Sequence, residues 1–410
     1  MKIENKSIYH QHNEIDENIQ KNMEEIRCKR KKRSMVIILS ILITLSILNI
    51  LSVGFYKEDL ISVKKHGIIM GIAMLVSLIP YKLNYQVYRS KFMKLLLGIG
   101  SLLILIFMIL GPSSIVKTFN GARGWISLGG FTLQPSEILK IPFIILLANV
   151  LAKGEEKKLS SRLIIFNSAL VFFIFAFFIC KQNDLGTVIH YGTIYIFMIF
   201  LTNIDKKLVT GTAIVGTISM IAGSFFIFRY VDKIESGYKL ARIKIFLEGL
   251  FKADKYIENA DIGYQVGQSL LAFGNGGILG RSYGSGVQKY NYLPEIHTDF
   301  IMALFGEEMG FIGVVSVIIL FFLLYNIIVD IGITCKNYFG RYLALGIAGY
   351  IISQFLINIF VALGLLPVFG IPMPIFSYGG SSMITIFVGI SIAFNINNSM
   401  FDKKQNKMYN

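Results

Sequence analysis

Residues 299–328 read DFIMALFGEEMGFIGVVSVIILFFLLYNII, a long apolar run that carries three acidic side chains near its start. An apolar run of about 18 or more residues can cross the hydrocarbon core of a bilayer as a helix. The stretch therefore predicts a membrane-spanning helix. It also raises the question of why Asp299, Glu307 and Glu308 are present where lipid is expected.

The whole chain shares this apolar character. Of its 410 residues, 54% are hydrophobic and 16% are charged, a balance too apolar for a water-soluble protein of this length. Long apolar runs recur ten times, at 35–54, 67–84, 92–111, 137–152, 163–180, 185–202, 208–230, 299–328, 342–366 and 377–397. The sequence predicts an all-α integral membrane protein with ten spans. Its membrane domain (35–398) is expected to follow a basic N-terminal tail (1–34) and to precede a short C-terminal tail (399–410).

The distribution of lysine and arginine predicts the orientation, because the inner loops of membrane proteins are enriched in these residues. The segment Arg27-Cys-Lys-Arg-Lys-Lys-Arg33 places six basic residues just before the first span. If that end is cytoplasmic, the remaining inner segments carry fifteen basic residues and the short outer loops carry six. Both termini are therefore expected in the cytoplasm. Residues 231–298 are expected to form a large extracytoplasmic loop between the seventh and eighth spans.

The formal net charge of +15 is explained by this orientation and by attraction to anionic lipid head groups. Membrane lipids, and not nucleic acid, are the expected partners of these charges. The three cysteines, Cys28, Cys180 and Cys335, lie far apart in the sequence and show neither a disulfide framework nor metal-ligand spacing.

The large loop contains two kinds of pattern. Apolar residues recur at helical spacing over 243–250 and over 262–273, which predicts two short amphipathic helices on the outer face of the bilayer. The run from Phe273 to Gly286 contains six glycines. Glycine lets a backbone approach a ligand closely and present N–H groups to an anion, although the same composition also fits a flexible loop.

Seven short motifs follow one another along the chain. They are Gly121-Ala-Arg-Gly-Trp125, Gln134-Pro-Ser-Glu137 with Lys140, Asp184-Leu-Gly-Thr187, Gly263-Tyr-Gln265, Tyr292-Leu-Pro-Glu295 running into His297-Thr-Asp-Phe300, Gly306-Glu-Glu308 and Ser377-Tyr-Gly-Gly-Ser-Ser382. Together and in this order, from about residue 35 to 398, they resemble the SEDS family of bacterial membrane proteins, whose branches are RodA, FtsW and SpoVE. His297-Thr-Asp299 and Gly370-Ile-Pro372 are more similar to the RodA branch.

Two positions depart from the pattern of that family. Asn183 stands where the family usually has proline, and Pro374-Ile-Phe replaces the commoner Pro-Phe-Ile. Both positions shape the backbone, so the departures concern local geometry more than chemistry.

The resemblance implies a ten-helix peptidoglycan glycosyltransferase that polymerises lipid II at the outer face of the bacterial plasma membrane, partnered by a class B penicillin-binding protein. It also implies a catalytic role for Asp299. Such a carboxylate would accept the proton of the attacking sugar hydroxyl, or would hold a divalent cation, Mg²⁺ or Mn²⁺, against the pyrophosphate leaving group. From the residues alone, Asp299 or Thr298 would simply cap the following helix.

Lys140 is the second catalytic candidate. Pro135 suits the first turn of a helix, which places Lys140 about one turn inside the fourth span, at a depth similar to that of Asp299. An isolated ammonium costs about 2.5–3.5 kcal/mol at the centre of a span, so a lysine there usually has a partner. We expect Lys140 to pair with Asp299. The alternative is that its side chain snorkels to the membrane surface.

Other polar residues inside the predicted spans have simpler expected roles. A continuous helix places Glu307 and Glu308 about 12–14 Å from Asp299, too far to share its chemistry. Structural pairing or a water-filled cavity is therefore expected for both. Asp184 is expected to cap the sixth span, and His190 is expected to be a core histidine with its hydrogen bonds satisfied.

The resemblance implies substrate contacts for a further set of residues, namely Trp125, Arg123, Arg242, Glu137, Gln265, His297 and Ser381. Guanidinium groups match phosphate oxygens bidentately, although both arginines could instead snorkel from the membrane surface. The single tryptophan, Trp125, could equally be an interfacial anchor. The serines and glycines of 377–382 suit close helix packing first and a site wall second.

Three functions compete on this sequence. An enzyme would use the charged candidates that gather at one face of the membrane. A flippase for the lipid-linked precursor would instead place ionisable residues along a path through the bilayer. A non-catalytic scaffold of the division or elongation machinery would tolerate changes to the charged outer residues.

Overall fold

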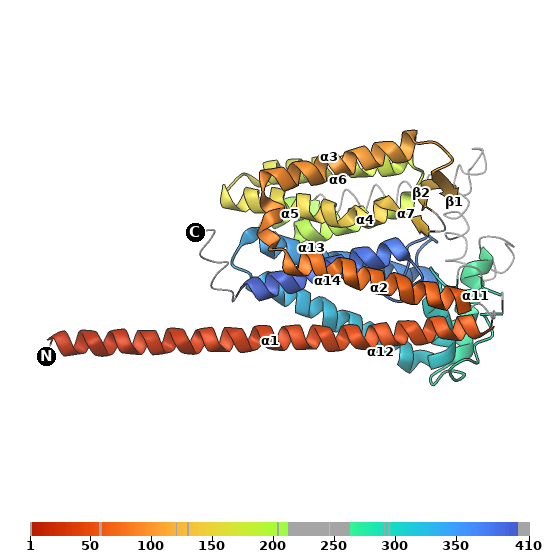
Figure 1. Ribbon diagram of the computed structural model, residues 1–410, viewed down its shortest axis with the longest axis horizontal. Coiled ribbons are helices and arrows are strands. Elements are labelled where there is room, and N and C mark those ends of the chain that lie inside the picture. Colours follow the sequence, from red (N-terminus) through yellow and green to blue (C-terminus); the bar gives the residue numbers. More distant parts are fainter. Residues whose placement is uncertain are drawn as a thin grey trace.

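The computed structural model describes residues 2–56, 60–119, 121–128, 131–202, 205–211, 246, 263–290, 292–293 and 296–400. The elements are α1 (Lys2–Tyr56), α2 (Leu60–Lys82), the 3₁₀ helix η1 (Tyr85–Arg89), α3 (Lys91–Leu110), β1 (Val116–Phe119), β2 (Ala122–Leu128), β3 (Phe131–Leu133), α4 (Pro135–Ile138), α5 (Lys140–Glu156), α6 (Ser161–Lys181), α7 (Leu185–Phe200), α11 (Gly263–Gly276), α12 (Ile301–Thr334), α13 (Tyr338–Ala362) and α14 (Gly380–Ser399). The long helices lie side by side in one bundle (Figure 1).

Eight helices in the described part of the chain are long and apolar enough to cross a membrane, and α7 is a shorter apolar helix. They fall on the predicted spans, with α4 and α5 together forming the fourth. The protein is therefore a multi-pass membrane protein, as its composition indicates. The predicted span at 208–230 lies outside the described residues beyond residue 211, and so does most of the loop at 231–262.

α1 is longer than the sequence predicted. The expected span began at residue 35, after a polar tail, whereas the helix runs without a break from Lys2 to Tyr56. Residues 2–34 contain neither proline nor glycine, and lysine, glutamate and glutamine are good helix formers. The change from polar to apolar residues near position 35 predicted where the apolar surface of α1 begins. It did not predict where the helix itself begins.

The expectation of an all-α protein was wrong in one segment. Residues 116–133 form a three-stranded antiparallel sheet in the order β1-β2-β3, in which Lys117 is paired with Trp125 and Ile126 with Leu133. These strands are rich in β-branched and aromatic residues, which favour extended structure. The segment is too short and too polar to register as a membrane span, so its secondary structure was not assigned from hydropathy.

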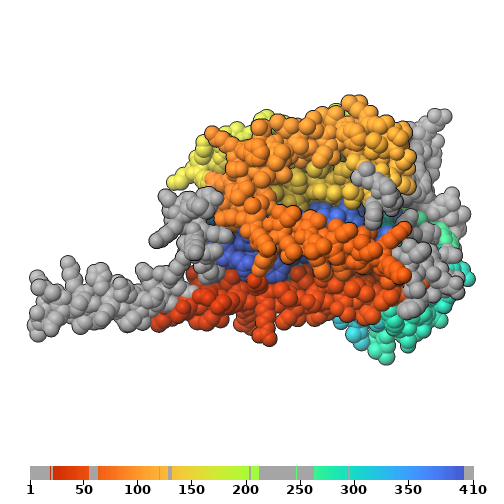
Figure 2. All heavy atoms as spheres, viewed as in Figure 1, coloured from red at the N-terminus to blue at the C-terminus, as the bar shows by residue number. Residues whose placement is uncertain are grey.

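The core of the bundle consists of α5, α13 and α14. Of the most apolar stretch of each helix, 83% is buried in α13 and α14 and 78% in the α4–α5 span, against 17% in α3. Bulky apolar side chains such as Phe92, Leu95 and Leu103 of α3 are exposed instead, as expected for a surface that faces lipid. In Figure 2 the blue atoms of the last helices show on this face only between the red and orange helices that cover them.

The two ends of the bundle differ in structure. At one end, Arg27 of α1 forms an ion pair of 2.9 Å with Asp330 near the end of α12, and Cys28 donates to the carbonyl of Asn397 on α14. The sheet and α11 lie at the opposite end (Figure 1). The first and last described helices therefore have their outer termini at the same end, away from the sheet.

Candidate functional site

A pocket with a volume of about 440 Å³ opens at the end that carries the sheet. Its walls come from β1 and β2, from α4 and the start of α7, from α11, from residues 298–299 and from the segment 367–382 that leads into α14. Six predicted site residues line it, namely Asp299, Glu137, Asp184, Trp125, Gln265 and Ser381. Residues as far apart in the sequence as Trp125 and Ser381 are thus brought to one cavity.

Asp299 is half-buried and lies just before the first turn of α12, which begins at Ile301 with Phe300 as its cap residue. The simple helix-cap interpretation does not fit the position of Asp299, because the cap residue of α12 is Phe300. Gly370 leaves room beside the carboxylate, since a Cβ added to Gly370 would lie 3.8 Å from Oδ2 of Asp299. Asp299 is thus a wall residue of the pocket and not the cap residue of α12.

Lys140 is completely buried, so snorkelling to the surface is excluded. Its ammonium group forms an ion pair with Glu137, and it lies 5.5 Å from the centre of the Tyr350 ring. The expected pairing with Asp299 was therefore wrong. Glu137 is three residues earlier, at the junction of α4 and α5, and residues at this spacing are neighbours on a helix surface. Lys140 and Asp299 were predicted to lie at similar depths in the membrane, but this did not mean that their side chains contact each other.

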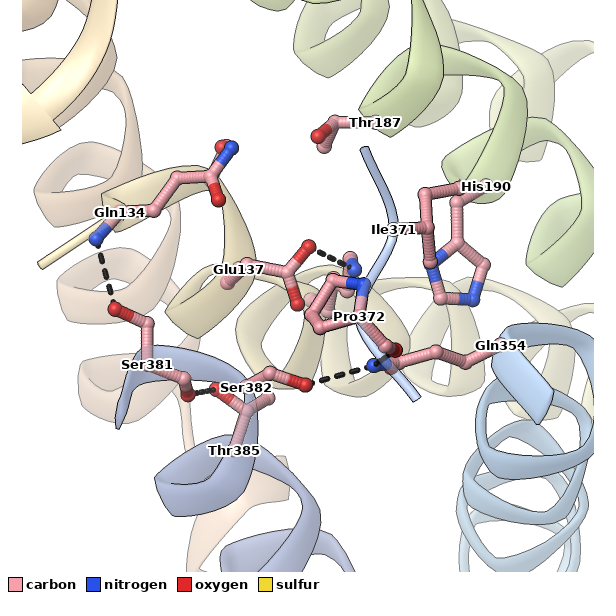
Figure 3. Close-up of polar contacts among 12 residues, drawn as sticks. Gln134, Glu137, Thr187, His190, Gln354, Ile371, Pro372, Ser381, Ser382 and Thr385 are labelled. Atoms are coloured by element: carbon pink, nitrogen blue, oxygen red, sulfur yellow. Dashed lines mark hydrogen bonds and ion pairs between the residues drawn. The ribbon is translucent and has the colours of Figure 1, made fainter. Parts of the chain in front are cut away.

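Glu137 connects this buried pair to the pocket. Its Oε1 accepts from Lys140, while its Oε2 is buried and has no hydrogen-bond partner within the described part of the chain. Glu137 also lines the pocket. Its side chain extends into the space between α4, α14 and Pro372 (Figure 3). A carboxylate oxygen in this position is suited to accept a hydrogen bond from a bound molecule.

Hydrogen bonds join three elements at the pocket wall, through Gln134, Asp184 and Ser381. The backbone N–H of Gln134 donates to Oγ of Ser381 at 2.8 Å, and its side-chain amide donates to Oδ2 of Asp184 at 2.8 Å (Figure 3 shows the first). Asp184 caps α7 as predicted, because its Oδ1 accepts from the N–H of Thr187 at 3.1 Å. These bonds fix α4, α7 and α14 relative to one another around the cavity.

The sheet supplies the aromatic part of the pocket. Trp125 packs edge-on against Phe119 with 5.8 Å between ring centres, and both residues line the cavity. Arg123 lies on the same strand but is not among the lining residues. Its guanidinium donates to the carbonyl of Gly111, and its backbone N–H donates to the carbonyl of Gln182 at 2.8 Å. Its contacts in the structure therefore hold the sheet to the ends of α3 and α6.

The remaining predicted contacts have different positions. Gln265 on α11 lines the pocket. His297 is half-buried and its carbonyl accepts from the N–H of Tyr378 at 2.8 Å, so the structure shows its backbone fixing the segment that carries Asp299. Arg242 lies outside the described residues.

Glu307 and Glu308 have partners in the segment that follows α11. Oε1 of Glu308 accepts from Lys289 at 3.0 Å, from Ser52 of α1 at 2.6 Å and from the N–H of Gly286. Oε2 of Glu307 accepts from the N–H of Gln288 at 3.0 Å. Both side chains are at least 98% buried. Their arrangement is the structural pairing expected from the sequence.

The glycine-rich run packs against α12. A Cβ added to Gly276 would lie 2.1 Å from the carbonyl of Gly306, and one added to Gly280 would lie 2.2 Å from the carbonyl of Glu308. The N–H of Phe311 donates to the carbonyl of Gly277 at 2.9 Å. The glycines of this run therefore allow its backbone to pack closely against α12.

A break in α12 explains how acids occur in so apolar a run. Gly310 has φ 66° and ψ −170° and interrupts the helix. Residues 311–334 alone are about 36 Å long, which is enough to cross the roughly 30 Å hydrocarbon core. Residues 301–309, with Glu307 and Glu308, are not needed for the span. The acids lie on the segment before the break, shielded by the 276–290 segment.

Sequence reasoning missed several polar residues around the site. Asn358 and Gln354 on α13 donate to the backbone of the pocket segment 371–372, and Lys289 neutralises Glu308. Asparagine and glutamine inside a predicted span are a usable signal, since an amide in lipid needs a partner. His190 is buried as expected, and its Nε2 lies 3.1 Å from Oγ of Ser353, but its Nδ1 has no hydrogen-bond partner among the described residues, so its hydrogen bonds are only partly satisfied.

The pocket has no ready-made metal centre among the residues that the structure describes, where no group of three His, Cys, Asp or Glu side chains is arranged to hold an ion. Asp299 is a hard oxygen donor of the type that Mg²⁺ and Mn²⁺ prefer. The protein would supply few of the ligands, and a substrate would have to supply others.

The model of the family described as "Cell cycle protein", which covers FtsW, RodA and SpoVE, matches residues 31–401. The chain belongs to this family. A "Probable peptidoglycan glycosyltransferase FtsW" from Geobacter sp. (strain M18) is 35% identical over 81% of this chain and 83% of its own length. The FtsW name of this relative favours the FtsW branch over the RodA branch that short motifs suggested.

Two solved structures share the fold. A chain described under "Structural coordination of polymerization and crosslinking by a peptidoglycan synthase complex" matches with a TM-score of 0.70 and 23% identity, covering 90% of this chain and 98% of its own. The rod shape-determining protein RodA of Thermus thermophilus matches with a TM-score of 0.62 and 22% identity, covering 89% and 96%. At these identities the likeness establishes the fold alone.

Proposed function

We propose that the protein is a peptidoglycan glycosyltransferase that polymerises lipid II into glycan strands. The observation that carries the proposal is the single pocket in which Asp299, Glu137, Asp184 and Trp125 meet. Membership of the FtsW/RodA/SpoVE family supports it, as does the name of the Geobacter relative, a probable peptidoglycan glycosyltransferase. Cell division, elongation and sporulation are the processes that use such strands.

Asp299 is the proposed general base. The acceptor sugar has a 4-hydroxyl whose oxygen attacks the anomeric carbon of the donor, and the bond from that carbon to the pyrophosphate oxygen breaks. The hydroxyl proton passes to the carboxylate of Asp299, and the bonding electrons leave with the pyrophosphate. A half-buried carboxylate in a pocket wall is reached by substrate and keeps its position through the backbone around it.

Lys140 acts in this proposal through Glu137 and not on the substrate, because it is buried beneath the pocket wall. Its ammonium forms an ion pair with the carboxylate of Glu137 and so holds that side chain in position. Glu137, Gln265, Trp125 and Ser381 are the proposed substrate contacts. The aromatic edge of Trp125 and Phe119 suits the apolar face of a sugar, and the carboxylate of Glu137 suits a hydroxyl or amide donor.

A divalent cation is compatible with the site as a second role for Asp299. The carboxylate would hold Mg²⁺ or Mn²⁺ together with the phosphate oxygens of the substrate, and the ion would neutralise charge on the leaving group. Arg242 and His297 remain proposed substrate contacts from the family resemblance.

The proposed topology has ten membrane spans, with both termini in the cytoplasm, a short C-terminal tail at 399–410 and the 231–298 loop outside the plasma membrane. The position of the pocket at the end opposite the Arg27–Asp330 ion pair supports an extracytoplasmic active face. The proposed partner is a class B penicillin-binding protein. Support comes from a solved relative, which belongs to a complex that coordinates polymerisation and crosslinking.

The test is polymerisation of labelled lipid II by the purified protein with its partner, comparing native protein with Asp299→Asn. The variant keeps the size of the side chain and removes the base, so the rate should fall by about 10²- to 10⁴-fold. Asp205→Asn is the matched control, because exposed Asp205 accepts from the N–H of Lys207 through an oxygen that asparagine retains.

Two outcomes would contradict the proposal. Equal polymer from native protein and Asp299→Asn would remove Asp299 from the chemistry. Exchange of lipid II between leaflets of a vesicle, with no polymer made by either protein, would favour the flippase.

A further inference from the structure

Three consecutive backbone carbonyls just before α12 accept hydrogen bonds from α13 and from the segment that leads into α14. The carbonyl of His297 accepts from the N–H of Tyr378 at 2.8 Å, and that of Thr298 accepts from Oγ of Ser377 at 2.5 Å. The carbonyl of Asp299 accepts from Nδ2 of Asn358 at 2.9 Å. The segment that carries the proposed base is therefore fixed residue by residue.

Asn358 has a special place in this set because it contacts both walls of the pocket around Asp299. Its Nδ2 donates to the carbonyl of Asp299 and, also at 2.9 Å, to the carbonyl of Ile371. Ile371 follows Gly370, where an added Cβ would lie 3.8 Å from Oδ2 of Asp299. The Nδ2 atom of Asn358 thus connects the backbone of Asp299 to the segment that contains Gly370 and Ile371.

The chemistry of asparagine suits this task. An amide NH₂ group has two hydrogens, one for each carbonyl, and neither leucine nor ionised aspartate can supply them. Asn358 is 99% buried, so water does not compete for these bonds. Its position on α13, the most buried of the long helices together with α14, gives the two bonds a rigid base.

We propose that Asn358 is a positioning residue for the glycosyl transfer reaction, setting the orientation of Asp299 toward the substrate through the two hydrogen bonds of its side-chain amide. The inference rests on the proposed function. Asn358 touches neither substrate nor reacting atoms. Its loss lets the 298–299 segment move relative to Gly370, and a shift of about 1 Å in a reacting group lowers a rate by about 10²-fold.

The experiment compares initial rates of lipid II polymerisation at several substrate concentrations for native protein, Asn358→Leu and Asn358→Asp. Leucine has a similar size and no donor. We expect kcat of Asn358→Leu to fall about 10- to 100-fold while KM stays within about twofold, because the pocket residues that bind substrate are unchanged. Asn358→Asp should be at least as slow, since its carboxylate repels both carbonyls.

Asn395→Leu is the matched control for a purely structural role. Asn395 is also a buried asparagine, whose Nδ2 donates to the carbonyl of Tyr81 at 2.8 Å and whose Oδ1 accepts from the N–H of Tyr85 at 2.9 Å. It lies near the end of α14, away from the pocket. Asn395→Leu should lower the unfolding midpoint about as much as Asn358→Leu and leave kcat per folded molecule within about twofold.

A second readout is the pH dependence of kcat. Moving Asp299 changes its surroundings, so the acidic limb of the profile should shift in Asn358→Leu and stay in place in Asn395→Leu. The inference is overturned if Asn358→Leu keeps native kcat, or if both leucine variants lose kcat equally. Failure of the proposed function is distinguished by Asp299→Asn, which would then polymerise lipid II normally whatever happens at Asn358.

Discussion

The ammonium of Lys140 and the carboxylate of Glu137 form an ion pair between residues three positions apart, with 0% and 4% of their side chains exposed. The pair lies at the junction of α4 and α5, and Glu137 reaches the pocket from it. A pair of this kind is costly to break on one side only, because the remaining charge stays buried without a partner.

Replacing Lys140 by methionine should therefore lower the free energy of unfolding by about 3–5 kcal/mol and abolish polymerisation. The double variant Lys140→Met/Glu137→Gln carries no charge at the junction and should regain most of that stability without regaining activity. Unfolding midpoints in detergent and lipid II assays measure the two effects. A single variant as stable as native protein would show that the pair is not coupled in solution.

A second buried pair, Lys289 and Glu308, should also be strongly coupled. Its side chains are 3% and 2% exposed and share Ser52 of α1 as a hydrogen-bond partner. A double-mutant cycle with Lys289→Met and Glu308→Gln should give an interaction free energy of about 1–3 kcal/mol.

The matched control for that cycle is the exposed pair Glu25–Lys29 on α1, whose side chains are 51% and 76% exposed. Its cycle should give a much smaller interaction free energy than the Lys289–Glu308 cycle, because water screens surface pairs. Similar values for the two cycles would contradict the structural role assigned to Glu308.

Two glycines with nearly the same positive φ should respond differently to alanine. Gly280 has φ 81° and Gly284 has φ 80°, so both substitutions introduce backbone strain of about 1 kcal/mol. A Cβ at Gly280 would also lie 2.2 Å from the carbonyl of Glu308, whereas one at Gly284 meets nothing within 4 Å. Gly280→Ala should thus be clearly less stable than Gly284→Ala by thermal unfolding. Equal midpoints would mean that the loop moves freely away from α12.

Restoring the commoner family residue at position 183 should be harmful in this protein. Asn183 has φ 58°, which proline cannot adopt, and its N–H donates to the carbonyl of Cys180 at 2.9 Å. Asn183→Pro should displace the neighbouring Asp184 from the pocket wall and reduce polymerisation by about tenfold or more.

Asn183→Gly is the companion variant, since glycine keeps both the N–H and the positive φ. Its activity and unfolding midpoint should stay close to those of the native protein. If proline at this position were tolerated as well as glycine, the turn before α7 would have to adopt another conformation.

The sequence was most informative about the membrane spans and about the family. Apolar length located the described spans, and the order of short motifs identified the family, because both depend on residue type alone. The N-terminal cap at Asp184 was also correctly predicted, since its hydrogen bond is local. The gathering of Trp125, Gln265 and Asp299 in one pocket came from the family resemblance and not from spacing.

The sequence did not reveal features that depend on where a side chain points or on contacts between segments that are distant in the sequence. Hydropathy placed Lys140 and Asp299 at similar depths, but depth does not state which way a side chain faces, and Lys140 contacts Glu137. The sheet at 116–133 was missed because it is held together by contacts between strands. The role of Asn358 was invisible for a similar reason, since both carbonyls that it contacts are distant in sequence.

The long helix α1 makes polar contacts with α12 near both ends of α12. Lys31 forms an ion pair with Asp330 at 2.9 Å, and Ser52 donates to Glu308 at 2.6 Å. Lys31 and Ser52 are 21 residues apart on the unbroken helix α1, or about 32 Å, close to the thickness of a bilayer's hydrocarbon core. The spacing of these polar contacts therefore sets the hydrophobic thickness that the two helices fit. A markedly thicker membrane would draw one of these polar contacts into lipid, so the protein is matched to bilayers of ordinary width.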